Sequence, residues 1–330
     1  MKVSIFDVAK RSGLSVVTVS RVLNQSEKVR EKNRQKVLDA IKELDYHPNA
    51  AAQSLARGKT RIIGLLVTTL QDPFFDAVVK EINDLLALQG YFLALSVSQG
   101  LNDEEGHYLL QEDRVDGVVL LSVFDEDKYI LELKRRKIPF VLIDNQQQDQ
   151  AVPSVVVDNF NGGYEATKHL LDLGHKQIAH ICGQEYFLST KERRRGFLQA
   201  LDEAGLEPYS IVYGEYDVEF GYSTARQWIQ KGKLPTAVFA GDDSIAIGFM
   251  NALLEAAIPV PQRISVVGYD DQTIASKLHP YLTTIRQPAE KIGQSAVELL
   301  LKWVDSRIAR SVTVKLKPEL IIRESTGKLD

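Results

Sequence analysis

From Arg61 onward, short apolar runs alternate with segments of helical periodicity, and this alternation restricts the fold more than any other feature of the chain. The helical segments include residues 74–88, 161–173, 191–204 and 244–257. The apolar runs are strand candidates, and they cover residues 62–67, 91–97, 117–122, 139–144, 154–158, 178–182, 236–241 and 264–270. Nearly continuous apolar strands separated by helices predict parallel sheets that are covered by helices on both faces.

A different pattern occupies residues 4–24, where two short segments with apolar residues at helical spacing flank a glycine. Ser4 is expected to cap the first helix and Ser15 the second, because a serine hydroxyl can accept from the free N–H groups of a first turn. Gly13 supplies a backbone position that can adopt positive φ between them. The pattern predicts a helix-turn-helix, whose second helix enters the major groove of DNA.

A third helix is expected from Glu31 to Leu44, closing a three-helix core. It should end at residues 46–49, because the residue before Pro48 is disfavoured in the α conformation. Residues 49–57 contain strong helix formers but are too few to form a stable helix alone in water. Residues 58–60, Gly-Lys-Thr, are expected to be a flexible linker.

The distribution of charge separates these first residues from the rest of the chain. Residues 1–60 contain 12 Lys and Arg against 6 Asp and Glu, whereas the whole chain has a net charge of −4. The remainder therefore carries about −10 by difference. A generic helical hairpin is the simpler interpretation of residues 4–24, but a basic head on an acidic body favours nucleic-acid binding.

The composition indicates the cellular compartment and the broad class of the protein. A chain of 330 residues with 44% hydrophobic content can bury a sizeable core and is expected to hold more than one domain. Cys182 is the single cysteine and lies in an apolar run, so it is expected to be a packing residue in a reducing cytoplasm. No apolar stretch approaches the ~20 residues of a membrane span, and the N-terminus lacks the apolar core of a signal peptide.

Several motifs in order resemble one known family. The run DVAKRSGLSVVTVSRVLN at residues 7–24 is followed by VLDAIKELDYHPNAAAQSLARGKTRIIGLLV at residues 37–67, GYDD at 268–271 and LTTIRQP at 282–288. Together they resemble the LacI/GalR family of bacterial transcription regulators over essentially the whole chain. The resemblance implies an all-α helix-turn-helix head and an α/β core of two lobes, similar to a type I periplasmic binding protein.

The resemblance also implies the division of the chain. The head would cover residues 1–48 and a hinge helix with its linker residues 49–60. The two-lobed effector-binding and dimerisation core would cover residues 61–330. Its first lobe would comprise about 61–160 and 286–318 and its second about 161–285 and 319–330, with crossings near Phe160, Thr284 and Pro318.

The cleft between two such lobes is the expected binding pocket. Five polar residues match effector-contacting positions of sugar-responsive relatives, and these are Asp144, Arg193, Asp242, Asp270 and Gln287. Tyr216 stands where relatives place an aromatic ring that stacks on the ligand. Asp72, Phe74 and Phe75 are further candidates, because they lie in the loop after the first strand. Carboxylates can accept from sugar hydroxyls, a guanidinium can donate to oxygens, and an aromatic face suits the apolar face of a pyranose. Helix capping and surface ion pairing are the simpler interpretations of the charged residues, and core packing is the simpler interpretation of Phe74 and Phe75. We expect one of these two phenylalanines to be a packing residue. Relatives often have Asn or Gly where Asp242 stands, and this additional acid favours a neutral polyol over an anionic ligand.

The DNA contacts follow from the same resemblance. The head is expected to use Ser15, Val16, Val17, Thr18, Ser20, Arg21 and Asn24, and the hinge Asn49, Ser54 and Leu55. Val16 and Val17 would meet thymine methyl groups, whereas Arg21 is the expected polar base contact. Leu55 would be inserted between base pairs in the minor groove, which kinks the duplex.

An enzyme is not expected. The six histidines are scattered, and neither a nucleophile-elbow nor a dinucleotide-binding motif is present. No metal or other cofactor is therefore expected beyond a small-molecule effector, a mono- or oligosaccharide. The chain is predicted to be a homodimeric repressor of a carbohydrate-utilisation operon, released from a pseudo-palindromic operator by a sugar. Two alternatives remain: a catabolite-control regulator whose DNA binding is promoted by a phosphorylated carrier protein, and a plain sugar-binding protein.

Overall fold

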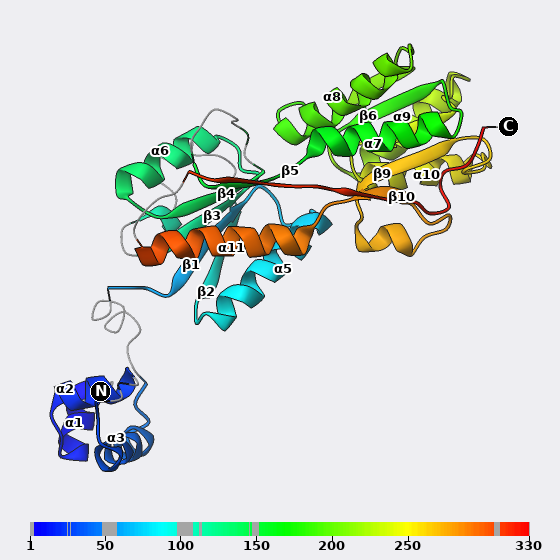
Figure 1. Ribbon diagram of the computed structural model, residues 1–330. Coiled ribbons are helices and arrows are strands. Elements are labelled where there is room, and N and C mark those ends of the chain that lie inside the picture. The colour runs from blue at the N-terminus through cyan, green and yellow to red at the C-terminus, as the bar shows by residue number, and fades with distance from the viewer. Residues whose placement is uncertain are drawn as a thin grey trace. The chain divides into compact units, whose positions relative to one another are not determined.

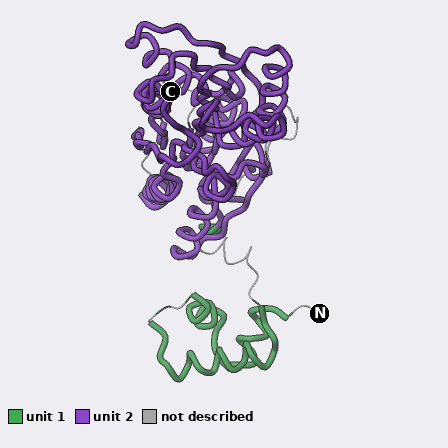
Figure 2. Tube along the Cα trace, turned by 90° about the vertical axis from the view of Figure 1, so that its right-hand side faces the viewer, with its two compact units in different colours: residues 1–61 green, residues 62–330 purple. Residues whose placement is uncertain are grey.

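The chain forms two compact units, residues 1–61 and residues 62–330 (Figure 2). The computed structural model describes residues 3–24, 26, 28–47, 58–97, 108–111, 114–144, 146, 152–306 and 311–329. The predicted hinge contacts Asn49, Ser54 and Leu55 lie outside the described residues.

The described residues of the first unit form the helices α1 (Ile5–Ser12), α2 (Val16–Leu23) and α3 (Glu31–Glu43) (Figure 1). Ser4 caps α1 in a reciprocal capping box, and Gly13 ends it with a φ of 68°. The unit's core consists of apolar side chains from all three helices, chiefly Val8, Val19, Val22 and Val37. The predicted helix-turn-helix head is therefore confirmed.

The predicted third helix, Glu31 to Leu44, is confirmed to within one residue, and a local C-cap ends it. The helix ends at Glu43, and Asp45 takes a left-handed φ of 47°. The Tyr46 N–H then donates to the Ile41 carbonyl oxygen at 2.9 Å, which satisfies a free carbonyl of the last turn. This local C-cap stops the helix before the restriction imposed by Pro48 applies.

The second unit consists of two lobes, each built on a six-stranded sheet. The first sheet has the order β11-β5-β4-β3-β1-β2 with every neighbour parallel. Its strands are β1 (Ile62–Val67), β2 (Phe92–Val97), β3 (Gly117–Leu121), β4 (Phe140–Ile143), β5 (Ser154–Val157) and β11 (Thr313–Leu316). Helices α5 (Pro73–Leu88) and α11 (Ala289–Ser306) pack on one face, while α6 (Glu126–Arg136) and the short η1 (Tyr108–Leu110) pack on the other (Figure 1).

The second sheet has the order β12-β10-β9-β8-β6-β7. Its strands are β6 (Ile178–Cys182), β7 (Ser210–Tyr213), β8 (Ala237–Ala240), β9 (Ser265–Asp270), β10 (Thr283–Arg286) and β12 (Glu319–Ile321), of which only β12 is antiparallel to its neighbour. Helices α7 (Asn159–Asp172) and α8 (Leu188–Glu203) cover one face, and α9 (Val218–Gln230) and α10 (Asp243–Glu255) cover the other; η2 (Thr273–Ser276) follows β9. The predicted two-lobed α/β core is confirmed.

The chain passes between the lobes three times, after β5, after β10 and after β11 (Figure 1). The second crossing lies slightly later than the position predicted near Thr284. Thr284 is still paired with Gly268 of β9, and β10 continues to Arg286 before α11 begins at Ala289.

Two glycines bring α7 and α8 into close contact. A Cβ atom on Gly163 would overlap the carbonyl oxygen of Arg193, and one on Gly196 would overlap that of Phe160. Only a residue without a side chain permits backbones to approach so closely. This contact fixes the position of Arg193 relative to the carboxyl ends of the strands.

Candidate functional site

The exposed face of α2 carries the predicted DNA contacts. Val19 and Val22 are buried in the core of the head, whereas Val17 is 60% exposed and Arg21 and Asn24 are also exposed. These three exposed residues are spaced by four and three positions, so they lie along one side of the helix. Val16, Thr18 and Ser20 are partly buried at the edges of this face.

The α2 N-terminus is locally ordered by Ser15. Its hydroxyl accepts from the Thr18 N–H at 3.2 Å and lies 2.9 Å from the Thr18 hydroxyl. Ser15 is therefore a helix cap as predicted, and this capping sets the start of the exposed face.

A cavity of about 390 Å³ lies between the two lobes of the second unit, within the usual range of small-molecule sites. The structure brings all nine predicted effector residues to its wall, namely Asp72, Phe74, Phe75, Asp144, Arg193, Tyr216, Asp242, Asp270 and Gln287. They come together because the carboxyl ends of the strands in both sheets face this cavity. Asp144 follows β4 and Asp270 ends β9, and both have positive φ values of 58° and 104°, an uncommon conformation for residues with a side chain.

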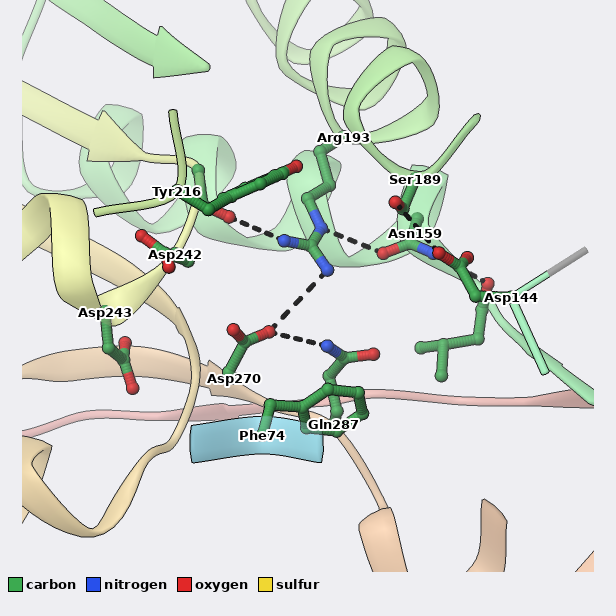
Figure 3. A network of polar contacts seen from close by, with 12 residues as sticks. Phe74, Asp144, Asn159, Ser189, Arg193, Tyr216, Asp242, Asp243, Asp270 and Gln287 are labelled. Atoms are coloured by element: carbon green, nitrogen blue, oxygen red, sulfur yellow. Dashed lines mark hydrogen bonds and ion pairs between the residues drawn. The ribbon is translucent and has the colours of Figure 1, made fainter. Parts of the chain in front are cut away.

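Arg193 is the centre of the polar network in this cavity (Figure 3). Its side chain is 7% exposed; Nε donates to Asn159 Oδ1 at 2.9 Å and one terminal nitrogen donates to the Gly241 carbonyl at 2.6 Å. The other terminal nitrogen lies 3.6 Å from Asp270 Oδ1. The guanidinium also packs 3.7 Å above the centre of the Tyr269 ring. Arg193 is thus held by fixed partners on every side.

Asp270 receives a second contact, because Gln287 Nε2 donates to its Oδ1 at 2.5 Å. Asp72 and Asp242 each cap a helix, accepting from the N–H groups of Phe74 at 2.9 Å and Ile245 at 2.7 Å. One oxygen of each carboxyl group is therefore bound within the protein. A carboxylate has about four acceptor positions, so each retains capacity for a ligand hydroxyl.

The acidic residues of the cavity have raised pKa values. Burial, followed by repulsion from Asp270, raises the pKa of Asp72 to about 7 and that of Asp242 well above its ordinary value. Burial also raises the pKa of Asp270, although Arg193 opposes the rise. Bringing several carboxyl groups together out of water disfavours their charged forms. The wall therefore presents carboxyl groups that can either accept or donate hydrogen bonds near neutral pH.

Asp144 joins the two lobes. Its Oδ2 accepts from Ser122 of the first lobe at 2.9 Å and from Ser189 of the second lobe at 3.2 Å. Next to it, Gln146 Oε1 accepts from the Leu188 N–H at 2.7 Å, which ties the end of β4 to the start of α8. The lobes are thus connected by hydrogen bonds on one side of the cavity.

A buried acid, Glu126, holds the backbone of Gln146 next to this connection. Glu126 is 3% exposed, and both of its carboxyl oxygens lie 3.2 Å from the Gln146 backbone nitrogen, whose N–H they accept. Burial raises the pKa of Glu126 to about 8, to which Asp144 and Asp127 also contribute by repulsion. Glu126 is therefore mostly protonated at neutral pH.

Aromatic rings complete the wall. Phe74 and Phe75 both line the cavity and both pack against the core of the first lobe, so the expectation that only one would be a packing residue was wrong. The start of α5 lies at the cavity mouth, where a ring can contact the core along one edge and the cavity along the other. The Tyr216 hydroxyl lies 2.6 Å from that of Thr190, which fixes its ring at the opposite side.

Several lining residues were not singled out from the sequence, among them Ser122, Phe124, Gln184, Phe187, Ser189, Glu215 and Asp217. Some follow a strand directly or within two residues, so the strand-end rule could have found them. Phe187 and Ser189 could not be found in this way, because they belong to the loop before α8 and its first turn.

The described part of the chain also bears on metal binding and membrane insertion. Those residues contain no group of three or more His, Cys, Asp or Glu able to hold a metal ion. None of the described helices is long and apolar enough to cross a membrane. Cys182 is buried as predicted, and burial raises the pKa of its thiol to about 12.

Both units of the chain match the profiles of known protein families. Residues 4–49 match the profile of bacterial regulatory proteins of the lacI family, and residues 167–326 match a periplasmic binding protein-like domain. The HTH-type transcriptional repressor PurR of Erwinia tasmaniensis is 38% identical over 330 residues, covering 98% of this chain and 97% of that protein. Its namesake from Mannheimia succiniciproducens is 36% identical over 331 residues, covering 99% of each.

The chain belongs to the lacI family of bacterial regulatory proteins. It is a DNA-binding transcriptional repressor that binds operator DNA and a small-molecule effector, and like the rest of the family it is not an enzyme. The lac repressor dimer bound to operator and the anti-inducer ONPF has the same fold, with a TM-score of 0.90 and 30% identity over 99% of this chain and 100% of that one. The complex of the transcriptional regulator CelR with cellobiose gives a TM-score of 0.74 and 30% identity over 98% of this chain and 100% of that one.

Proposed function

We propose that this repressor controls a carbohydrate-utilisation operon and is released from its operator by a neutral sugar bound between the lobes. The observation that carries the proposal is the charge of the cavity. Asp72, Asp144, Asp242 and Asp270 line it, whereas Arg193 is the only cation among its described lining residues. Arg193 is already committed to Asn159, Gly241 and Asp270.

This arrangement favours a ligand with many hydroxyl groups and no negative charge. Hydroxyls donate to carboxylates and accept from protonated carboxyls, so both forms of these acids can bind them. A phosphorylated or carboxylated ligand would face several acids with no free cation to offset its charge. The faces of Phe74 and Tyr216 can cover the apolar face of a pyranose. A flat heterocycle would stack on the same rings, but it would leave most of the carboxyl groups without a partner.

The cavity also explains how an effector can act on DNA binding. Asp72 and Asp144 belong to the first lobe, and Arg193, Asp242 and Asp270 to the second. The affinity for a ligand that contacts both lobes would therefore depend on how the lobes are arranged. An effector that binds one arrangement of the lobes better shifts the protein toward it. DNA and sugar then oppose each other through a single coupling free energy.

On DNA, α2 would lie in a major groove. Val16 and Val17 would contact thymine methyl groups, Arg21 a base, and Thr18, Ser20 and Asn24 bases or phosphates, with Ser15 at the helix start. The hinge contacts Asn49, Ser54 and Leu55 stay a prediction, as does the division into a head of residues 1–48, a hinge of 49–60 and a core. A homodimer would place two heads on a pseudo-palindromic operator, in the bacterial cytoplasm.

The proposal is tested by measuring operator affinity against a panel of effectors. The full chain is titrated onto a fragment of the DNA beside its own gene, with neutral sugars, sugar phosphates or nucleobases present. We expect one neutral sugar to weaken DNA binding and sugar phosphates to have no effect. An Arg193→Ala variant that still binds DNA should lose the response.

Two results would contradict the proposal. Release by a nucleobase or sugar phosphate alone would show a different effector class. Indifference to every small molecule, with tighter DNA binding in the presence of a phosphorylated carrier protein, would favour the corepressor-dependent alternative.

A further inference from the structure

The cavity extends well beyond the acids at its centre. Asp270 ends β9 and Asp242 follows β8, whereas Gln184 follows β6 and Glu215 follows β7. These strands are neighbours in the order β9-β8-β6-β7. At about 4.8 Å between adjacent strands, the lining residues are spread over about 14 Å of the sheet edge. The backbone positions of Asp270 and Glu215 are therefore farther apart than one six-membered sugar ring is wide.

The two ends of the cavity differ in character. Arg193, Asp242 and Asp270 form an inner subsite, and each of these three residues is at most 9% exposed. Gln184, Glu215 and Asp217 form the polar side of an outer subsite, in which both acids are exposed to solvent. Gln184 Nε2 donates to Glu215 Oε2 at 2.5 Å, which orients that carboxylate.

A row of aromatic rings connects the two subsites. Tyr216 lies beside the inner acids, the Phe187 ring centre is 6.5 Å from that of Tyr216, and the Phe124 ring centre is 5.5 Å from that of Phe187. All three rings line the cavity. Phe124 comes from the first lobe and Phe187 from the second, so the outer end of the row is completed only when the lobes meet. Aromatic faces in a row, flanked by hydrogen-bonding groups, suit consecutive sugar rings.

We propose that the effector is a neutral disaccharide or longer oligosaccharide. Its first unit occupies the inner subsite, and its second lies against Phe124 and Phe187 within reach of Gln184, Glu215 and Asp217. This inference rests on the proposed function, because it names the size of the sugar that the same cavity selects. It makes the outer subsite the part of the protein that distinguishes a disaccharide from its component monosaccharides.

The test is calorimetric titration of the full chain with glucose, galactose and fructose and with maltose, trehalose, cellobiose, lactose and sucrose. We expect at least one disaccharide to bind at least tenfold more tightly than either of its component monosaccharides. A monosaccharide that binds as tightly as every disaccharide containing it would overturn the inference but leave the proposed function intact. If no sugar binds at all, the proposed function itself fails.

Variants test where the second unit lies. Phe187→Ala and Glu215→Ala should each lower the ratio of disaccharide to monosaccharide affinity by at least tenfold. Glu215 is exposed, so its variant serves even if loss of the Phe187 ring disturbs folding. Glu185→Ala is the matched control, because Glu185 is an exposed neighbour that pairs with Arg194 at 3.3 Å. Equal loss of both affinities in the two outer variants, or an equal effect of the control, would overturn the assignment.

Discussion

Replacing Glu126 by glutamine should make the protein more stable at alkaline pH than the natural chain. The carboxyl group is buried, with a pKa of about 8 against an ordinary value of 4.5. An acid whose pKa is raised by folding contributes full stability below 4.5, and that contribution is lost as the pH rises toward 8. The difference corresponds to about 5 kcal/mol at 1.36 kcal/mol per pH unit.

Most of this loss falls within an accessible range of pH. At pH 5 the group is protonated in the folded protein and already mostly ionised in the unfolded chain, whereas at pH 9 it is ionised in both states. Between these values the natural chain should therefore lose about 4 kcal/mol of unfolding free energy relative to Glu126→Gln. That is a large part of the total for a typical domain, about 5–15 kcal/mol. Glutamine can still accept from the Gln146 N–H, so the two chains should be similar at pH 5.

The measurement is urea unfolding of both chains at pH 5, 7 and 9, followed by circular dichroism. Glu132→Gln is the matched control on the same helix, α6. Arg135 and Arg136 donate to the Glu132 carboxylate and lower its pKa to about 2, so its replacement should have the same effect at all three pH values. If the natural chain and Glu126→Gln lose stability in parallel from pH 5 to pH 9, the carboxyl group is hydrated and the reasoning is refuted.

Three further changes test the head and the lobe that holds Arg193. Arg21→Ala should weaken operator binding by about 1–3 kcal/mol, measured by fluorescence anisotropy, and relax the sequence preference at the contacted base pair, because it removes the polar base contact from the exposed face of α2; unchanged affinity would place the groove-reading face elsewhere. Ser15→Ala should cost the head about 1 kcal/mol, seen as a lower melting temperature, since it removes the cap of α2. Gly163→Ala should destabilise the second lobe by about 1–3 kcal/mol and weaken effector binding, because the new methyl group overlaps the Arg193 carbonyl oxygen. Normal effector binding in that variant would show that the α7–α8 contact does not position Arg193.

Much of the candidate site was predictable because parallel strands all end at the same edge of their sheet. Asp242 and Asp270 follow strands of one sheet, so that rule places them together. Asp144 follows a strand of the other sheet, and only the resemblance to a two-lobed family placed it at the same cleft. The rule does not distinguish Asp242 from its neighbour Asp243. In the structure the Asp243 side chain does not line the cavity. Its carboxylate instead accepts from the Thr284 hydroxyl at 2.5 Å and from the Gln272 N–H at 2.7 Å.

The sequence by itself determined the features that depend on near neighbours in the chain. The caps at Ser4 and Ser15, the turn at Gly13 and the alternation of strands and helices all follow from local hydrogen bonding and backbone freedom. Only the tertiary structure decided which groups lose contact with water. Glu126 lies in the acidic run Asp125–Asp127, which would suit a solvated helix start, yet packing buries it and raises its pKa. Burial and pairing depend on residues far away in the sequence, and local periodicity carries no information about them.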